Sequence, residues 1–156
     1  MRISVLSVGR RMPAWVDSGF REYAKRMPQE CSLNLLEIDP VTRAKGVATA
    51  RASAIEGQRL LNAVPKGARV IALDVRGRSW DTQDLARGLR QWMMDGKDLA
   101  LLVGGADGLS EDCLDQADQR WSLSPLTFPH QLVRVILAEQ LYRAWTLTQG
   151  HPYHRG

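Results

Sequence analysis

Short runs of β-forming residues alternate with longer helical patterns along this chain. The β-rich runs are Ile3–Val8, Leu33–Ile38, Val70–Asp74, Leu99–Val103 and Arg120–Leu123. The helical patterns are Pro13–Met27, Ala48–Ala63, Asp81–Met94, Ser110–Ala117 and Pro129–Thr148. Short strands separated by helices predict βαβ units, in which a parallel sheet carries helices on both faces. The expected fold class is therefore α/β.

Residue types at the predicted boundaries agree with this pattern. Pro13 and Pro129 suit the first turn of a helix, where the missing N–H costs nothing. Ser79 or Asp81 can cap the next helix, and Asp84 has the position of the capping-box acid if Asp81 is the cap. Gly96 is expected to end that helix in a left-handed conformation.

Nothing in the 156 residues divides the chain, so we expect one domain spanning residues 1–156. Hydrophobic residues make up 44% and charged residues 24%, which is typical of a soluble globular protein. No apolar run is long enough to predict a membrane span or a signal peptide. Cys31 and Cys113 lack CxxC spacing, which favours a reduced, cytoplasmic compartment and gives no indication of a metal site.

The charge balance leaves the partner open. The chain has 21 Lys and Arg against 17 Asp and Glu, a net charge of +4. Such a surplus is compatible with RNA or DNA binding, because neutralising phosphates releases counterions. It is equally compatible with solubility alone. Sequence motifs of P-loop nucleotide binding (GxxxxGK[ST]), zinc proteases (HExxH) and serine hydrolases (GxSxG) are absent.

Two loops are candidate ligand sites. Val103–Gly108 is a glycine-rich turn after a predicted strand, where backbone can approach a ligand closely. A tight β-to-α turn without a ligand explains the glycines as well. Trp121–His130 combines two prolines, three hydroxyl groups and large apolar side chains, which suits a planar ligand with a polar rim. A loop that merely covers the end of the sheet is the alternative.

The last residues are unusually rich in chemically active side chains. Residues 149–156 contain His151, Tyr153, His154 and Arg155. Imidazole changes protonation near neutral pH, and arginine makes paired contacts with phosphate. A solvated chain end is the simpler alternative. The two histidines are not four residues apart on a predicted helix, so we expect no metal site here.

Several motifs, taken together, resemble one family. They are Leu101–Gly105, Gly108–Ser110, Trp121–Ser124, Leu126–His130, Leu132–Val135, Leu141–Trp145 and His151–Arg155. This combination is similar to the pseudouridine N3-methyltransferases of large-subunit ribosomal RNA, in the SPOUT superfamily. Ala106-Asp107 and the final Gly156 depart from the family pattern. The resemblance implies a C-terminal trefoil knot, a cofactor-binding part at about residues 70–156, and a homodimer.

The resemblance also implies the chemistry. The methyl donor would be S-adenosyl-L-methionine, and the substrate would be N3 of a pseudouridine in helix 69 of 23S rRNA within the ribosome. The implied donor-binding residues are Leu73, Gly104, Gly105, Leu123, Ser124, Pro125, Leu126, Thr127 and Phe128. The implied catalytic residues are His154 as base or proton relay, Tyr153 on the target base, and Arg143 and Arg155 on RNA or developing charge.

Alternatives remain open at this point. Arg143 lies four residues after Glu139, so a simple ion pair on a helix explains it equally well. The same fold also suits methylation of another rRNA or tRNA position, or a non-catalytic ribosome-binding module. Arg10, Arg11, Arg76 and Arg78 are candidate RNA contacts or ordinary surface residues. We expect neither a metal nor a membrane as partner.

Overall fold

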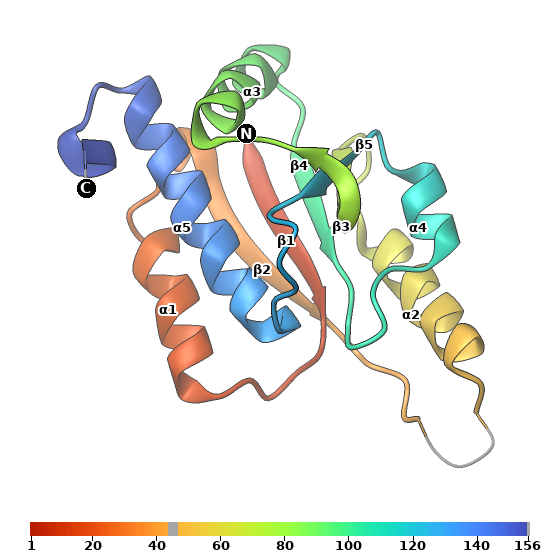
Figure 1. Ribbon diagram of the computed structural model, residues 1–156. Helices are drawn as coiled ribbons and strands as arrows, with labels where there is room; N and C mark the ends of the chain where they lie inside the picture. Colours follow the sequence, from red (N-terminus) through yellow and green to blue (C-terminus); the bar gives the residue numbers. More distant parts are fainter. Residues whose placement is uncertain (44–46, 156) are drawn as a thin grey trace.

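A sheet of five strands runs through the middle of the molecule, between two layers of helices (Figure 1). The computed structural model describes residues 1–43 and 47–155. Its strands are β1 (Arg2–Val8), β2 (Ser32–Ile38), β3 (Arg69–Ser79), β4 (Leu99–Val103) and β5 (Gln119–Ser122). Its α-helices are α1 (Ala14–Ala24), α2 (Thr49–Ala63), α3 (Thr82–Asp95), α4 (Glu111–Gln116) and α5 (His130–Thr148). Two 3-10 helices are η1 (Gln29–Cys31) and η2 (Pro152–Arg155).

The strand order is β2-β1-β4-β3-β5, and all four neighbouring pairs are parallel. Helices α1, α3 and α5 cover one face, and α2 and α4 cover the other (Figure 1). The predicted α/β class and parallel sheet are confirmed. The trefoil knot is not among these observations and stays a prediction.

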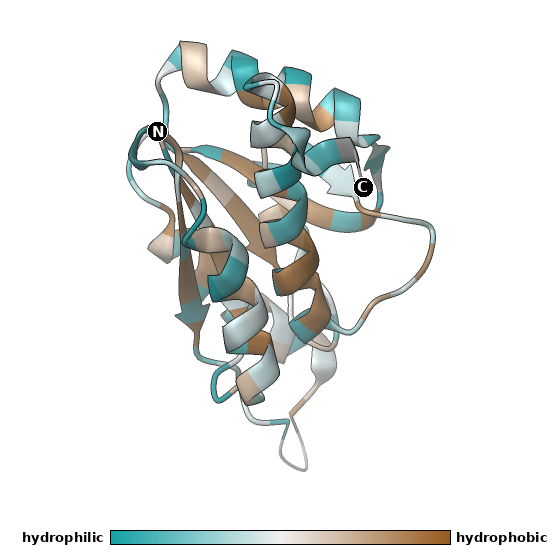
Figure 2. Ribbon diagram, turned by 90° about the vertical axis from the view of Figure 1, so that its left-hand side faces the viewer, coloured by the Kyte–Doolittle hydropathy of each residue, from teal (hydrophilic) through white to brown (hydrophobic). Residues whose placement is uncertain are grey.

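Alternate residues of the central strands enter two separate cores. Leu99, Leu101 and Val103 of β4 pack under α1, α3 and α5, whereas Ala100 and Leu102 pack under α2 and α4. Successive side chains of a strand point to opposite faces, so a strand buried on both sides needs an unbroken apolar run. Figure 2 shows this as largely hydrophobic strands behind helices that carry both hydrophilic and hydrophobic residues.

The helix boundaries have the predicted local causes. The Asp81 side chain accepts from the Asp84 amide at 2.7 Å, and Asp84 accepts from the Asp81 amide at 3.0 Å, which completes the capping box of α3. Gly96 ends this helix with φ 75°. Pro13 and Pro129 are the residues immediately before α1 and α5.

Two predicted boundaries were wrong. Helix α1 ends at Ala24 rather than Met27, because the chain turns through residues 25–27 toward η1. Strand β3 continues to Ser79 rather than stopping at Asp74. Trp121 of β5 pairs with both Leu73 and Arg78, so residues 74–77 form a bulge between two stretches of regular pairing. This bulge lies on β3 beside the edge strand β5 and shapes the surface next to the candidate site.

Cys31 and Cys113 are both buried and free. Within the described parts of the chain, no helix is long and apolar enough to cross a membrane.

Candidate functional site

A pocket of about 190 Å³ opens where β3, β4 and β5 end. In parallel sheets the loops after neighbouring strands meet at this edge, which is where ligands usually bind. The lining residues are Leu73, Asp74, Val75, Val103, Gly104, Gly105, Gly108, Trp121, Leu123, Ser124, Leu126, Thr127, Phe128, His130 and Val133. Three segments that are far apart in the sequence therefore form one site with the start of α5.

Eight of the nine residues proposed from the resemblance to bind the donor line this pocket. The exception is Pro125, which is exposed and does not line it. Sequence reasoning missed Asp74, Val75 and Val133, which also line the pocket, whereas Trp121 and His130 lie within the candidate loop Trp121–His130. Asp74 is the polar residue that ends a hydrophobic run, and that break was the available signal.

The glycine turn after β4 has no room for a side chain at Gly104. A Cβ atom there would lie 2.4 Å from the carbonyl carbon of Gly108 and 2.7 Å from the amide nitrogen of Leu109. The turn is closed by the Gly108 amide, which donates to the Gly105 carbonyl at 3.1 Å, with Gly108 at φ 77°. Only glycine permits this backbone to fold so tightly against itself at the pocket wall.

A network of charged side chains also stabilises the same turn. Arg43 donates to Asp107 at 2.8 Å and to Glu56, whose side chain is almost fully buried on α2. Glu56 also accepts from the Val41 amide at 2.9 Å. The hydrogen bonds to Glu56, followed by those to Asp107, raise the pKa of Arg43, so the guanidinium stays charged. Asp107, one of the two departures from the family pattern, thus ties the turn to the β2–α2 segment.

Hydroxyl groups shape the loop between β5 and α5. The Ser122 hydroxyl donates to the Ser124 carbonyl at 3.2 Å, and the Ser124 hydroxyl accepts from the Leu126 amide at 3.0 Å. Leu126 is left 70% exposed at the rim of the pocket, and Val75 on the β3 bulge is 59% exposed. The pocket therefore has an apolar rim that the described part of this chain leaves uncovered.

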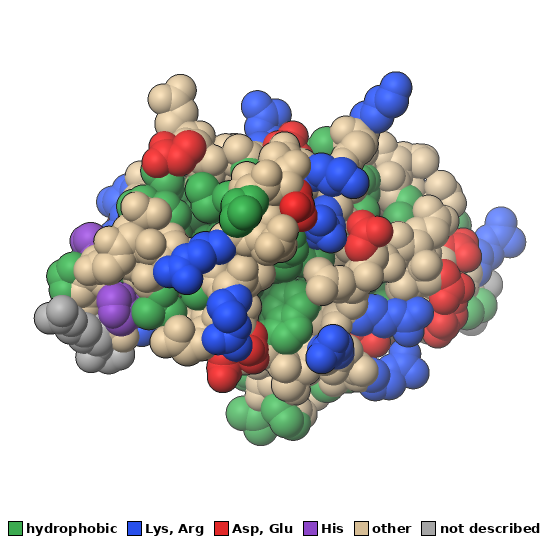
Figure 3. All heavy atoms as spheres, turned by 90° about the horizontal axis from the view of Figure 1, so that it is seen from above, with side chains coloured by type: hydrophobic (Ala, Val, Ile, Leu, Met, Phe, Trp, Pro, Cys, Tyr) green, Lys and Arg blue, Asp and Glu red, His purple; other side chains and the backbone are tan. Residues whose placement is uncertain are grey.

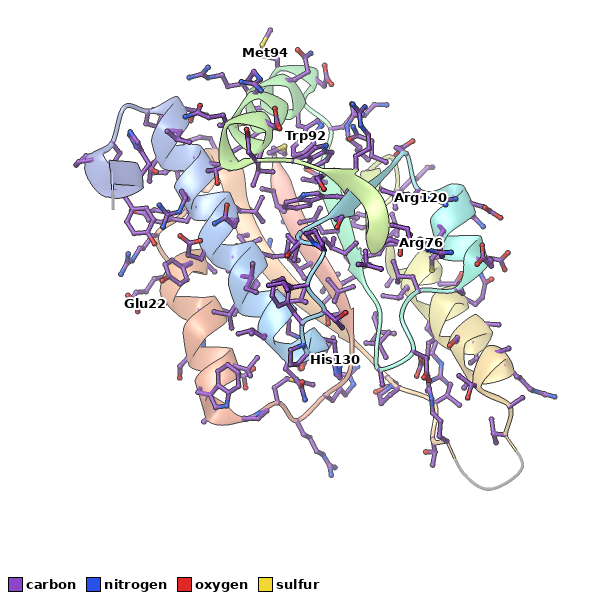
Figure 4. The ribbon with its side chains drawn as sticks, in the orientation of Figure 1. Glu22, Arg76, Trp92, Met94, Arg120 and His130 are labelled. Carbon is purple, nitrogen blue, oxygen red and sulfur yellow. The ribbon has the colours of Figure 1, made fainter. Side chains whose placement is uncertain are left out.

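A fully buried arginine fixes the start of α5 beside the pocket. Arg134 donates to the Ser7 hydroxyl at 3.1 Å, to the Gly9 carbonyl at 3.0 Å and to Glu37 at 2.8 Å. These bonds join α5 to the ends of β1 and β2. His130, one turn earlier, is half-buried, and burial, followed by the charge of Arg134, lowers the pKa of its imidazole. It is labelled at the lower end of α5 in Figure 4.

Among the described residues, Asp74 is the only acidic one that lines the pocket. Its Oδ2 atom is buried and makes no hydrogen bond within the described residues, and its nearest cation is Arg76 Nε at 3.8 Å. A carboxylate without a hydrogen-bond donor in a pocket wall is suited to a ligand that brings positive charge or a donor.

The tail packs on the other half of α5. The Tyr153 hydroxyl donates to Glu139 at 3.2 Å, and Arg143 forms an ion pair with Glu139 at 2.6 Å while lying over the Tyr153 ring. The ion pair that explained Arg143 without a catalytic role is therefore present. Burial is the largest cause that raises the pKa of Tyr153, so its phenol stays protonated at neutral pH. His154 is half-buried, and its Nδ1 atom has no hydrogen-bond partner among the described residues. Arg155 ends η2, and its side chain, like Gly156, lies outside the described part of the structure.

The structure does not bring the tail to the pocket of the same chain. His130 begins α5 and Tyr153 follows its end, and a helix of 19 residues is about 28 Å long. Figure 1 shows the C-terminus and the pocket loops at opposite ends of α5. Among the described residues, no group of three or more His, Cys, Asp or Glu side chains is arranged to hold a metal ion.

Comparisons with known proteins agree on one family. Residues 1–154 match the family model described as "Predicted SPOUT methyltransferase". The chain is 60% identical over 155 residues to a protein of Thioalkalivibrio sulfidiphilus and 61% identical over 155 residues to one of Alkalilimnicola ehrlichii, covering 99% of both chains in each case. Both relatives are named "Ribosomal RNA large subunit methyltransferase H". A solved structure titled "Probable Methyltransferase from Bordetella pertussis Tohama I" has a similar fold, with a TM-score of 0.58 at 17% identity over 91% of this chain and 95% of that one.

Proposed function

This chain belongs to the SPOUT methyltransferase family, and on that premise we propose that it methylates ribosomal RNA of the large subunit with S-adenosylmethionine as donor. The observation that carries the proposal is the identity of about 60% to large-subunit rRNA methyltransferases over nearly the full length of both chains. The finer target, N3 of a pseudouridine in helix 69 of 23S rRNA, follows from the resemblance. A ribosomal substrate would place the protein in the cytoplasm.

The pocket fits the proposed donor. Leu73, Leu123 and Leu126 supply apolar contacts for adenine, and the glycine turn allows backbone to approach closely. The carboxylate of Asp74, which has no hydrogen-bond donor among the described residues, suits a ligand carrying a positive sulfonium. When bound, S-adenosylmethionine supplies an electrophilic methyl group. The chain's own contribution is to orient that group, and orientation accounts for up to roughly 7–11 kcal/mol of a barrier.

The acceptor nitrogen needs help from a base. N3 of pseudouridine carries a proton and is a poor nucleophile until that proton leaves. We propose that the imidazole of His154 accepts this proton. Tyr153 is protonated at neutral pH, and Arg143 and Glu139 form an ion pair with each other. With its proton on His154, N3 would be able to accept the methyl group that a bound donor supplies. A positioned base of this kind contributes roughly 10²–10⁴-fold to the rate.

The separation of tail and pocket supports a homodimer. A tail at the far end of α5 serves a donor pocket only if the pocket belongs to a second copy of the chain. The exposed Leu126 and Val75 at the pocket rim are apolar surface that a partner would cover. The proposed active site is thus shared between two chains.

The first prediction tests His154 and the shared site. His154→Ala should bind S-adenosylmethionine in calorimetry as the parent does, yet lose at least about 100-fold in methyl transfer to ribosomes. Gly104→Val should lose donor binding, because its side chain collides with the backbone of Gly108. Mixing the two inactive variants should restore activity, since one kind of site in a mixed dimer combines an intact pocket with an intact tail.

Other outcomes would contradict specific parts of the proposal. Normal methylation by His154→Ala would remove its role as base. Absence of recovery in mixtures whose exchange is verified would remove the shared site. Mass spectrometry of RNA from a deletion strain identifies the nucleotide whose methylation is lost. A loss in tRNA or at another rRNA position would replace the proposed target. Ribosome binding without donor affinity would indicate a non-catalytic module.

A further inference from the structure

Two adjoining hollows lie along the outer edge of the sheet, apart from the donor pocket. The first, of about 320 Å³, lies between α3 and the start of β3 and β5. The second, of about 390 Å³, lies against the β3 bulge and β5. Trp80 and Gln119 line both, so the hollows form one continuous feature, which we call the edge groove. Figure 3 shows a hollow with hydrophobic side chains at its floor and charged side chains around its rim.

The first hollow has the features of a site for a planar heterocycle. Trp80 lines it and is half-buried, and Trp92, which is 6% exposed, lies against Trp80 with ring centroids 6.0 Å apart. Two polar atoms in its lining, Arg69 Nε and Gln119 Oε1, are buried and have no hydrogen-bond partner within the described residues. One is a donor and the other an acceptor. Nucleobases offer a flat face for stacking and mixed donors and acceptors at their edge.

The second hollow supplies positive charge. Arg76, Arg78 and Arg120 line it, and Arg76 is 73% exposed at its side chain. Figure 4 labels Arg76 and Arg120 on the outer side of β3 and β5, and Trp92 beneath α3. The lining acid Asp118 accepts from the Val70 amide at 2.8 Å, and Asp95 in the first hollow pairs with Arg69. These acids therefore have internal partners. Arg120 donates to the Leu114 carbonyl at 3.2 Å and pairs with Asp115 at 3.4 Å, and Arg76 lies 3.8 Å from Asp74, but all three arginines remain exposed.

The bulge of β3 builds this arrangement. A Cβ atom on Gly77 would lie 2.6 Å from the carbonyl carbon of Arg120, so glycine lets the bulge rest directly on β5. The bulge thereby brings Arg76 and Arg78 beside Arg120. Trp80 stacks on Trp121 at 4.9 Å, and Trp121 lines the donor pocket. The edge groove is therefore separated from the donor pocket by two stacked indole rings.

We propose that the edge groove binds a single-stranded RNA segment next to the methylated nucleotide, with one base against Trp80 and Trp92 and the phosphates on Arg76, Arg78 and Arg120. A basic groove with an aromatic platform is how proteins bind single strands without reading a long sequence. Because two indole rings separate the groove from the donor pocket, the base in the groove is not the one that is methylated. We place it next to the target nucleotide along the strand. The proposal rests on the proposed RNA substrate and adds where that RNA lies.

The test uses a fluorescein-labelled oligouridylate and the full chain. Replacing Arg76, Arg78 and Arg120 together by Gln should weaken binding about tenfold or more at low salt. It should also lower the slope of log affinity against log salt by roughly 2, at about 0.7 for each phosphate contact in a single strand. A matched triple variant, Arg2→Gln, Arg21→Gln and Arg51→Gln, removes the same charge from exposed positions away from the groove and should keep the parent's slope. Thermal melting verifies that both variants fold.

A second measurement locates the base. The chain has five tryptophans, so fluorine NMR of the 5-fluorotryptophan protein gives five signals that Trp→Phe variants assign. Oligouridylate should shift the Trp80 and Trp92 signals and leave Trp15 unchanged. An unaltered slope in the groove triple, or shifts confined to Trp15, would overturn the proposal. Equal shifts from uridine monophosphate that persist in the groove triple would assign the groove to a free nucleotide instead.

The two proposals fail separately. If the parent protein methylates ribosomes but the groove variants bind RNA normally, only the groove proposal is contradicted. Donor binding and methyl transfer both absent from the parent protein would remove the proposed function, whatever the oligouridylate titration gives.

Discussion

His130 shows how one buried group makes stability depend on pH. Burial and the nearby charge of Arg134 lower the pKa of its imidazole below the ordinary 6.5. As the pH falls through 6.5, the unfolded chain takes up a proton that the folded chain does not. The unfolded state then binds more protons, so the free energy of unfolding decreases as the pH is lowered. Above 6.5 this contribution is constant.

The corresponding prediction concerns His130→Gln. Urea unfolding of the parent between about pH 5 and 7.5 should show a loss of stability toward acid, and the variant should show less of it, because glutamine does not titrate. His151→Gln, at an exposed position, should keep the parent's dependence. If His130→Gln loses as much stability toward acid as the parent does, other groups cause that loss.

At single residues, the sequence predicted what depends on local geometry. Gly104 and Gly105 were proposed at the site from the resemblance, and the need for glycine in a turn after a strand agreed with it. Glu139 with Arg143 was visible as an i, i+4 pair. The hydrogen bond from Arg43 to Asp107 joins residues that are 64 positions apart in the chain, and no spacing rule predicts such a contact. The same applies to Asp74, whose place in the pocket depends on which strands are neighbours.

Among the elements, α3 owes its position beside the edge groove to a cap that the sequence specifies. Asp81→Ala removes the acceptor for the Asp84 amide and should cost about 1 kcal/mol of stability in urea unfolding. Gln83→Ala, on an exposed side of the same turn, should change it by less than about 0.5 kcal/mol. Equal effects of the two substitutions would mean that the cap contributes nothing.

Strand β3 is the element that periodicity described least well. Its apolar run ends at Asp74, but its pairing resumes at Arg78 because Gly77 lets the bulge lie on β5. The polar residues of the second stretch, Arg78 and Ser79, carry no strand signal. Pairing with a partner strand decided their conformation, and the paired residues, Trp121 and Ser122, are 43 positions further along the chain. The surface that we propose for RNA is built from this unpredicted stretch.

At the scale of the whole molecule, alternation predicted a parallel sheet between helices but not its strand order. The order β2-β1-β4-β3-β5 places β3 between β4 and β5, so the segments that follow these three strands meet at one edge and assemble the pocket. The trefoil knot and the homodimer come from the resemblance, because local periodicity contains no information on threading or association. The general rule disfavours knots, so fold physics alone would not have suggested the knot that the resemblance implies.

Arg134 couples the two halves of the molecule and provides the last prediction. It has no exposed surface, and it joins α5, from the C-terminal part, to Ser7, Gly9 and Glu37 in the N-terminal part. Arg134→Met would leave these acceptors without a donor and should lower the free energy of unfolding by about 3–5 kcal/mol.

Adding Glu37→Gln to Arg134→Met should recover part of the loss, because the unpaired carboxylate then disappears. Arg26→Met removes an exposed ion pair with Glu22, labelled in Figure 4, and should change stability little. Chemical denaturation of the four proteins measures these differences. If Arg134→Met and Arg26→Met were equally mild, the buried guanidinium would not be what holds α5 against β1, and the pocket's geometry would need another support.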